Sequence, residues 1–480
     1  MTARQLVCVG TEAATHPLRK TTVTDTFLRE LGQALADTSA PLLDEADVLP
    51  YLDDRSGTAG ARALAVVRPG DAAEVATVLT LAHRHRVPVV TRGAGTGLSG
   101  GATAVDGCLV LSTERLNRIV EISPEDEVAV VQPGVINADL NGALAAYGLY
   151  YAPDPASHAI STIGGNIATN AGGLRSAKYG VTRDSVLALD VVLADGTALR
   201  TGHRSVKGVT GLDLTALFVG SEGALGVIVG ATVRLRPLPA ATATVSAYYP
   251  SVRAALDGVR QISRTGVVPA VAELIDHASL RNIDEHSGSR LTDGGHVLLL
   301  VRTDGHAAAA EAEDIAAALR HTGGDARRVT DEAEAERLWE LRRSGRGRTR
   351  PLWTVGEDVA VPKSKVARMY EEGERIGRRY GLDFAAVAHA ADGNLHPVLS
   401  RPVPEGTPAT SPAPPELDAA ADELVRAALA LGGTITGEHG VGVTKRRWLE
   451  DELGAAGLAL QRGVKAVFDP LGILNPGKAL

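Results

Sequence analysis

The stretch with the clearest chemistry is His389–His396, which reads His-Ala-Ala-Asp-Gly-Asn-Leu-His. Asp392-Gly393 is a dipeptide favoured in two-residue type I′ turns, which predicts a tight hairpin in which His389 faces His396. Directly opposed residues on antiparallel strands have Cβ atoms about 4.5–5.5 Å apart. Two imidazoles at that separation offer half of a divalent metal site, and Glu438-His439 could supply the rest. The alternative is two unrelated histidines on a surface turn.

Three glycine-rich stretches form the second signal. Gly95–Gly100 matches G-x-G-x-x-G, but Gly100–Gly107 is a poor helix, so we interpret the loop as an anion-binding nest rather than a Rossmann motif. Ser161–Gly173 is small and polar, and can lie flat against a planar ring. Gly220–Gly226 precedes a buried strand. Together they indicate a cofactor with a diphosphate and a ring system, which describes FAD. For the first loop, a simple surface turn is the alternative.

Periodic patterns predict the elements that position these residues. Ala72–Arg86 is predicted to be a helix capped by Asp71, and Asp195-Gly196 is predicted to turn a hairpin. From Ala240 onward strands alternate with helices, which predicts an antiparallel sheet with helices on one face.

Composition excludes several classes of protein. The 480 residues are 44% hydrophobic and 22% charged, which is ordinary for a globular chain of two or three domains. A net charge of -8 argues against nucleic acid as a partner. Cys8 and Cys108 are too few for a disulfide framework, a cysteine zinc site or an iron–sulfur cluster held by this chain alone. No apolar run is long enough to span a bilayer, and we expect a cytoplasmic protein.

The motifs resemble those of the FAD-linked 2-hydroxy-acid dehydrogenases related to the glycolate oxidase flavoprotein subunit, D-lactate dehydrogenase and D-2-hydroxyglutarate dehydrogenase. The matching segments, in family order, are Arg92–Gly101, Pro153–Ser157, Ile163–Gly173, Gly220–Gly226, His389–His396, Gly437–Gly442 and Asp469–Gly477. The resemblance implies an α+β fold, with a vanillyl-alcohol-oxidase-type (PCMH-type) FAD domain and an α+β substrate cap containing an antiparallel sheet. The expected division is an N-terminal helical segment (1–58), the FAD domain (59–239), the cap with the metal hairpin (240–433) and a C-terminal segment that returns to the flavin (434–480).

The resemblance also implies residue roles. His389, His396 and Glu438 would bind a divalent metal, zinc or manganese, and His439 would be the catalytic base. The first glycine loop has no histidine for covalent attachment, so FAD is expected to be non-covalent. The residues expected to bind it are Thr91, Arg92, Gly93, Ala94, Gly95, Thr96, Gly97, Pro153, Asp154, Ser161, Thr162, Gly164, Gly165, Asn166, Thr169, Asn170, Gly173, Glu222, Val227, Ile228 and Asn475.

Substrate recognition is expected at Arg342, because Trp339-Glu-Leu-Arg342 resembles the family's W-x-x-R. A guanidinium can clamp a carboxylate with two hydrogen bonds, although an arginine-rich helix end can also be merely solvated. Gly356 stands where D-2-hydroxyglutarate dehydrogenases often have lysine, and Glu357 follows it. We therefore expect a monocarboxylate such as D-lactate or glycolate, oxidised to the 2-oxo acid by hydride transfer to flavin N5.

Two other functions fit the same motifs. One is a metal-independent flavin alcohol oxidase, and the other is a flavin subunit that only passes electrons within a larger complex. The electron acceptor could be a quinone, a cytochrome, an electron-transfer flavoprotein or oxygen, and the chain could form a homodimer. Any iron–sulfur relay would lie on a partner protein.

Overall fold

The computed structural model describes residues 17–344, 351–408 and 411–480. Residues 1–16 of the predicted N-terminal helical segment lie outside the described part, as do residues 345–350 of the arginine-rich stretch. The chain forms two compact units. Unit 1 contains the described residues as far as Ala171, together with Val181–Leu238 and Glu438–Leu480. Unit 2 contains Gly172–Gly180 and Pro239–Gly437.

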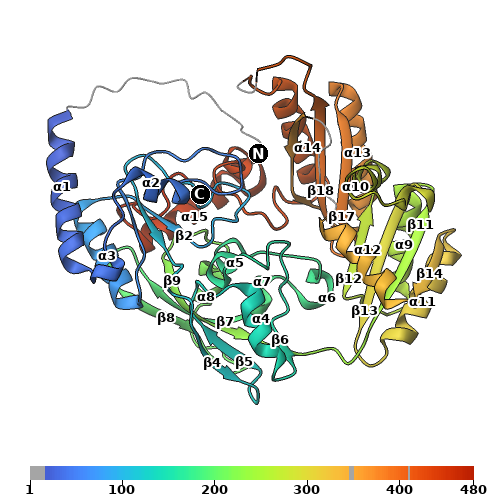
Figure 1. The fold of residues 1–480 in the computed structure, drawn as a ribbon, viewed down its shortest axis with the longest axis horizontal. Helices are drawn as coiled ribbons and strands as arrows, with labels where there is room; N and C mark the ends of the chain where they lie inside the picture. The colour runs from blue at the N-terminus through green and yellow to red at the C-terminus, as the bar shows by residue number, and fades with distance from the viewer. Residues whose placement is uncertain (1–16, 345–350, 409–410) are drawn as a thin grey trace. The chain divides into compact units, whose positions relative to one another are not determined.

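Unit 1 is built on two main sheets (Figure 1). The smaller is parallel, with strand order β1-β3-β2, and the larger is antiparallel, with order β4-β5-β9-β7-β8. The strands of unit 1 are β1 (Ala65–Val67), β2 (Val89–Arg92), β3 (Leu109–Ser112), β4 (Ile119–Ser123), β5 (Val128–Val131), β6 (Leu149–Tyr150), β7 (Val186–Val192), β8 (Ala198–Gly202), β9 (Val227–Arg234) and β10 (Arg236–Pro237). Its helices are α1 (Pro17–Ala34), α2 (Glu45–Val48), α3 (Ala72–His85), α4 (Asn137–Ala145), α5 (Ile163–Thr169), α7 (Thr182–Ser185), α8 (Leu214–Phe218) and α15 (Leu449–Phe468).

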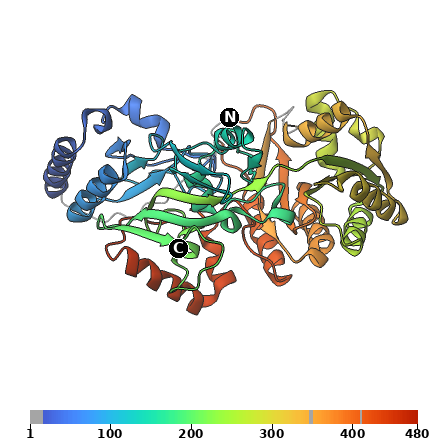
Figure 2. The same cartoon turned by 90° about the horizontal axis from the view of Figure 1, so that it is seen from below.

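The local predictions for unit 1 are confirmed. The Asp71 carboxylate accepts the Glu74 N–H at 2.9 Å and starts α3, and Arg86 ends it at φ +55°. β7 and β8 form the expected hairpin, with Val192 opposite Ala198. The helices α1 and α3 lie side by side at the blue end of the chain in Figure 2, and their buried apolar residues share one core with the parallel sheet. Packing on that core fixes the end of β2, and therefore the start of the first glycine loop.

Unit 2 is built on one antiparallel sheet of order β14-β11-β13-β12-β17-β18-β15, with β16 also paired to β18. Its strands are β11 (Thr242–Tyr249), β12 (Val271–Ile275), β13 (Val297–Asp304), β14 (Asp325–Val329), β15 (Leu352–Gly356), β16 (Val359–Ala360), β17 (Asp383–His389) and β18 (Asn394–Pro402). Its helices are α6 (Ser176–Tyr179), α9 (Val252–Arg264), α10 (His277–Ser287), α11 (Ala308–His321), α12 (Glu332–Ser344), α13 (Val366–Tyr380) and α14 (Pro415–Ala430).

The expectation of helices on one face of this sheet was wrong. Side chains of α10 and α12 pack with Ile275 and Leu298 on one face. On the opposite face Tyr249 donates a hydrogen bond to the Leu319 carbonyl of α11 at 3.1 Å. Nearly every residue of β12 and β13 is buried, so these strands have no polar face that would leave one side open to solvent.

Candidate functional site

A cavity of about 1000 Å³ opens in unit 1 beside the first two glycine-rich stretches. Arg92, Gly93, Ala94 and Thr162, all predicted to bind the cofactor, line it. No helix begins within the loop after β2, as the nest interpretation requires. A cavity of this size, whose lining combines apolar residues with charged ones such as Arg68 and Glu114, suits an extended ligand that has polar groups.

The N-terminal segment also lines this cavity, which the sequence did not reveal. Pro50 and Tyr51 are among the lining residues. The buried guanidinium of Arg92 donates to the Asp53 carbonyl at 2.6 Å and to the Pro50 carbonyl at 3.3 Å. Burial lowers the pKa of Arg92. Arg92 therefore ties the N-terminal segment to the glycine loop.

The second glycine-rich stretch forms α5 and its flanks. The Thr162 hydroxyl accepts the Gly165 N–H at 3.2 Å and caps the helix, while Asn170 ends it at φ +50°. A Cβ on Gly164 would overlap Pro133, so only glycine allows this approach of the two backbones.

Seven buried side-chain polar atoms in unit 1 have no hydrogen-bond partner within the described part of the chain. Four of them belong to residues predicted to bind FAD: Thr91 Oγ1, Ser161 Oγ, Asn166 Nδ2 and Asn475 Oδ1. The other three are His83 Nδ1, Thr103 Oγ1 and the Tyr151 hydroxyl. Buried polar groups are nearly always satisfied, so the four atoms on predicted cofactor residues favour a polar ligand there. The residues present therefore fit the cofactor.

The other predicted cofactor residues have varied surroundings. Val227 and Ile228 begin β9, and their side chains belong to the two hydrophobic cores of unit 1. The Pro153 carbonyl accepts the Asn137 amide at 3.1 Å. Gly173 belongs to unit 2. Gly95, Thr96 and Gly97 lie in the first loop, Asp154 follows Pro153, and Thr169 bonds the Gly165 carbonyl in α5.

In unit 2 the predicted hairpin exists, but its register was wrong. His389 pairs with Asn394, and His396 pairs with Val387. The loop has four residues, because the Asp392 and Gly393 N–H groups both donate to the His389 carbonyl, at 3.2 and 3.1 Å. Asp392-Gly393 therefore closes the loop instead of forming its centre.

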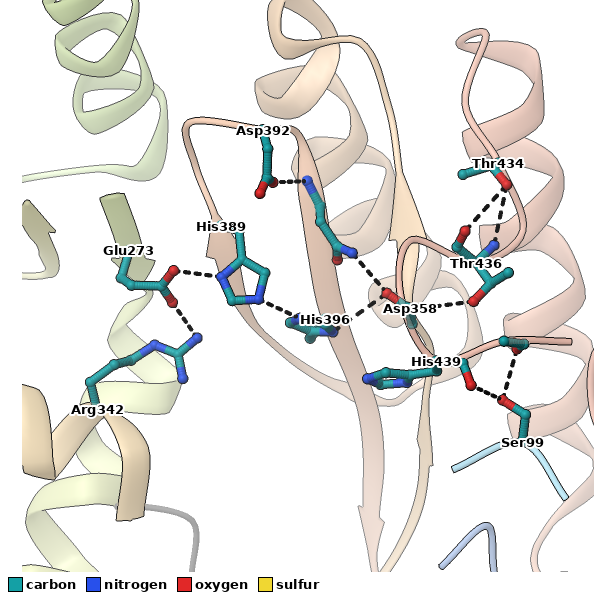
Figure 3. A network of polar contacts seen from close by, with 12 residues as sticks. Ser99, Glu273, Arg342, Asp358, His389, Asp392, His396, Thr434, Thr436 and His439 are labelled. Carbon is teal, nitrogen blue, oxygen red and sulfur yellow. Dashed lines mark hydrogen bonds and ion pairs between the residues drawn. The ribbon is translucent and has the colours of Figure 1, made fainter. Parts of the chain in front are cut away.

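The two imidazoles nevertheless meet, because residues two apart on a strand share a face. His396 lies opposite Val387, two residues from His389, so the rings are diagonal neighbours. Their Nε2 atoms are 3.2 Å apart and the rings are nearly perpendicular, at 86° (Figure 3). The convergence predicted from the sequence is therefore present with a different pairing.

Each histidine has a carboxylate on its Nδ1 side (Figure 3). His389 Nδ1 lies 2.5 Å from Glu273 Oε1, and His396 Nδ1 lies 3.7 Å from Asp358 Oδ1. Both carboxylates are fully buried. At 2.5 Å the Glu273 carboxylate keeps the proton of His389 on Nδ1, so His389 Nε2 directs a lone pair toward His396, which is the usual arrangement around histidines that bind metals. Asp358 is beyond hydrogen-bond distance of His396 Nδ1 and contributes a nearby negative charge. The donor set therefore fits a divalent metal.

Arg342 lies on this same face of the sheet and forms an ion pair with Glu273. Trp339, one helical turn earlier, is buried, and its indole donates to the Thr244 hydroxyl at 3.0 Å, which fixes the rotation of α12. Burial alone would raise the pKa of Glu273, but the charges of Arg342 and His389 outweigh it and lower that pKa. Glu273 was missed by the sequence analysis, although a glutamate within the buried strand β12 was a usable signal.

Glu438 and His439 belong to unit 1, where they begin its C-terminal segment. Gly437, directly before them, belongs to unit 2, and a Cβ on it would overlap the Asn394 amide. The carbonyls of His439 and Gly440 accept from the Ser99 hydroxyl at 2.8 and 2.7 Å. The Glu222 carboxylate accepts the next two N–H groups. Glu222, predicted to contact the cofactor, thus binds the backbone of this segment.

Comparison with known proteins identifies the class. Residues 63–202 match a family described as FAD binding domain, and residues 238–479 match the C-terminal domain of FAD linked oxidases. The chain belongs to this family of FAD-linked oxidases and is a FAD-dependent oxidoreductase. Among the described residues, no helix has both the length and the apolar character needed to cross a membrane.

Relatives agree with this assignment, and a solved structure shares the fold. The chain is 42% identical to glycolate oxidase subunit GlcD of Bacillus subtilis, over 86% of this chain and 88% of that protein. It is 35% identical to a D-lactate dehydrogenase of Archaeoglobus fulgidus, over 86% and 91%. The structure of p-cresol methylhydroxylase matches with a TM-score of 0.77 at 18% identity, over 95% of this chain and 97% of that one. The predicted fold class is confirmed.

Proposed function

We propose that this chain is a FAD- and divalent-metal-dependent dehydrogenase that oxidises a 2-hydroxy acid of the glycolate or D-lactate type to the 2-oxo acid. One observation carries the proposal: two imidazoles converge through Nε2 while buried carboxylates lie on their Nδ1 sides. The names of the relatives, glycolate oxidase subunit and D-lactate dehydrogenase, support the substrate class.

The ligand set would be His389, His396 and Glu438. Glu438 follows Gly437, where an added Cβ would meet Asn394 and Asp358. Asn394 pairs with His389, and Asp358 lies beside His396. Because consecutive Cα atoms are about 3.8 Å apart, the covalent chain keeps Glu438 within reach of the histidine pair. When bound, the cation would supply a Lewis acid for the substrate hydroxyl, and FAD would supply the hydride acceptor at N5.

The chain's own residues would handle the proton and the substrate charge. Oxidation of the alcohol releases one hydride from carbon and one proton from oxygen, and we assign the proton to the His439 imidazole. Arg342 balances the charge of Glu273, and its Nε has no partner within the described residues. That N–H would remain available for the substrate carboxylate.

The preference for a monocarboxylate is proposed from Gly356. Within the described residues an added Cβ at Gly356 would meet Val398 at 3.9 Å, which is ordinary contact, so space does not require glycine here. The position lacks the cation that a second carboxylate would need. Glu357 adds a negative charge next to it. A second substrate carboxylate would therefore be disfavoured.

The test is anaerobic reduction of the bound flavin by glycolate, D-lactate, L-lactate, D-malate and D-2-hydroxyglutarate, with metal content measured on the same sample. We expect rapid bleaching by glycolate or D-lactate and about one divalent ion per chain. Bleaching without metal would favour a metal-independent oxidase. No bleaching with any hydroxy acid would favour an electron-transfer subunit, and a preference for D-malate or D-2-hydroxyglutarate would overturn the assigned substrate.

A further inference from the structure

We propose that Glu222 and Ser99 are positioning residues that hold the Glu438–His439 segment in place through its backbone. The catalytic consequence rests on the proposed function, because it requires His439 to be the base. The attachment itself does not depend on that function. It assigns to two of the glycine-rich loops a task beyond cofactor binding.

Glu222 binds two successive peptide groups with its two oxygens. Oε1 accepts the Val441 N–H at 2.7 Å, and Oε2 accepts the Gly442 N–H at 2.8 Å. The side chain is buried, and burial raises its pKa although both amides lower it. A carboxylate used in this way has both oxygens committed to the chain.

The backbone of Glu222 is itself fixed in an unfavourable conformation. Its φ is +50°, in the left-handed region that disfavours residues other than glycine. Its N–H donates to the Ala168 carbonyl at 2.8 Å, and its carbonyl accepts the Asn475 amide at 2.5 Å. Strained backbone of this kind persists only where its surroundings impose it.

Ser99 holds the same segment from the first glycine loop. Its hydroxyl lies within hydrogen-bond distance of the His439 and Gly440 carbonyls, and its own carbonyl accepts the Val443 N–H at 2.8 Å. Gly442 has φ +48°, and a Cβ there would overlap the Ser99 carbonyl. The residues that follow His439 are therefore bound on both sides by short polar contacts.

The decisive variant is Glu222→Gln, because glutamine offers one acceptor oxygen and one amide donor. One of the two backbone N–H groups would then face a donor. We expect hydrogen–deuterium exchange at Val441 and Gly442 to become at least about tenfold faster, with no change in Glu125→Gln, which removes an exposed carboxylate of unit 1. Unchanged protection of both amides would overturn the proposal, whatever the enzyme oxidises.

Kinetics separate positioning from direct flavin binding. We expect Glu222→Gln to lower kcat about 10- to 100-fold, with KM and the Kd for FAD within about threefold of wild type, since small displacements of a catalytic group have effects of this size. Weaker FAD binding with normal kcat at saturating FAD would instead make Glu222 a cofactor ligand. Should Glu222→Gln not fold, Ser99→Ala is expected to lower kcat alone, and normal turnover by that variant would contradict the proposal.

If wild-type enzyme is not reduced by any hydroxy acid, the proposed function fails, but the exchange experiment still decides whether Glu222 holds the segment. If wild type is reduced and Glu222→Gln keeps both its protected amides and its kcat, the proposed function stands and the positioning role fails. The two failures therefore give different results.

Discussion

Two buried glutamates, one in each unit, have pKa values shifted in opposite directions. In unit 1, burial raises the pKa of Glu222, whose oxygens accept two neutral backbone N–H groups. In unit 2, the charges of Arg342 and His389 overcome the effect of burial and lower the pKa of Glu273. The kind of partner therefore decides the protonation behaviour of a buried carboxylate.

Other buried groups follow the same rule. Lys478 in unit 1 donates to the carbonyls of Gly101 and Thr103, and burial lowers its pKa to about 8. Asp276 is in unit 2 but accepts only from N–H and O–H donors of Ser279, Ala386 and Tyr370 in its described hydrogen bonds, and burial raises its pKa. Glu222 and Lys478 of unit 1 thus bind neutral backbone groups, whereas the histidine pair of unit 2 lies beside the charged groups of Glu273, Arg342 and Asp358.

The largest expected effect comes from removing an imidazole of the unit 2 pair. His389→Ala should lower kcat by about 10⁴-fold and abolish metal binding, because a Lewis acid supplies several kcal/mol of stabilisation. His296→Ala is the matched control, since His296 is exposed and stacks on His277 in the same unit. Stopped-flow flavin reduction and elemental analysis measure both. Full activity in metal-free His389→Ala would refute the metal role.

The second effect tests the buried charges directly. Glu273→Gln leaves the Arg342 guanidinium buried without its counter-ion, which should lower the free energy of unfolding by about 3–5 kcal/mol. Glu313→Gln removes a carboxylate that pairs with Arg328 at the surface and should change it by less than about 1 kcal/mol. Urea unfolding compares the two variants. Equal losses would mean that the Glu273 pair has no special importance for stability.

The local sequence pattern was sufficient to predict that the two histidines of the unit 2 hairpin converge. Alternation along a strand places His389 and His396 on one face under either pairing, so their convergence did not depend on the exact register. The register itself depended on tertiary context. The Ala390 N–H donates to the Ala272 carbonyl of β12, which extends the pairing of β17 into the loop. A turn dipeptide contains no information about that neighbouring strand.

The residues that surround the histidines were harder to predict. Glu273 comes from β12 and Asp358 from the link between β15 and β16, and both are distant from the hairpin in sequence. Only strand order brings Glu273 opposite His389, and strand order follows from packing of the whole sheet. A sequence pattern can identify a residue that could act in catalysis. The carboxylates that set the protonation of such a residue are placed beside it by long-range contacts, which a local pattern does not show.

Lys478 gives a pH-dependent test of the dipole-held charges in unit 1. Its pKa is about 8 in the folded chain against 10.5 ordinarily, so between these values the unfolded chain binds more protons. Above pH 10.5 the amine is neutral in both states, and its burial does not lower the free energy of unfolding. As the pH falls from 10.5 to 8, the unfolded chain takes up a proton that the folded chain does not, and the free energy of unfolding decreases. The difference is up to about 3 kcal/mol.

Other groups also titrate in this range, so the comparison is with Lys478→Met. We expect the wild-type free energy of unfolding to rise relative to that of Lys478→Met between pH 8 and 10, measured by urea unfolding at each pH. Parallel curves would show that the ammonium of Lys478 is not disfavoured by burial.

The smallest expected effect concerns the close backbone approach that shapes the cavity of unit 1. Gly164→Ala should lower the free energy of unfolding by about 1–3 kcal/mol and weaken FAD binding, because the added methyl overlaps Pro133, which must move. Gly142→Ala is the control: Gly142 lies within α4, and a Cβ there meets nothing within 4 Å. That change should stabilise the chain by about 0.5–1 kcal/mol.

Titration of FAD and urea unfolding measure both effects. Since the two variants add the same atoms, a matching response would mean that the fit of Gly164 against Pro133 does not shape the cofactor site.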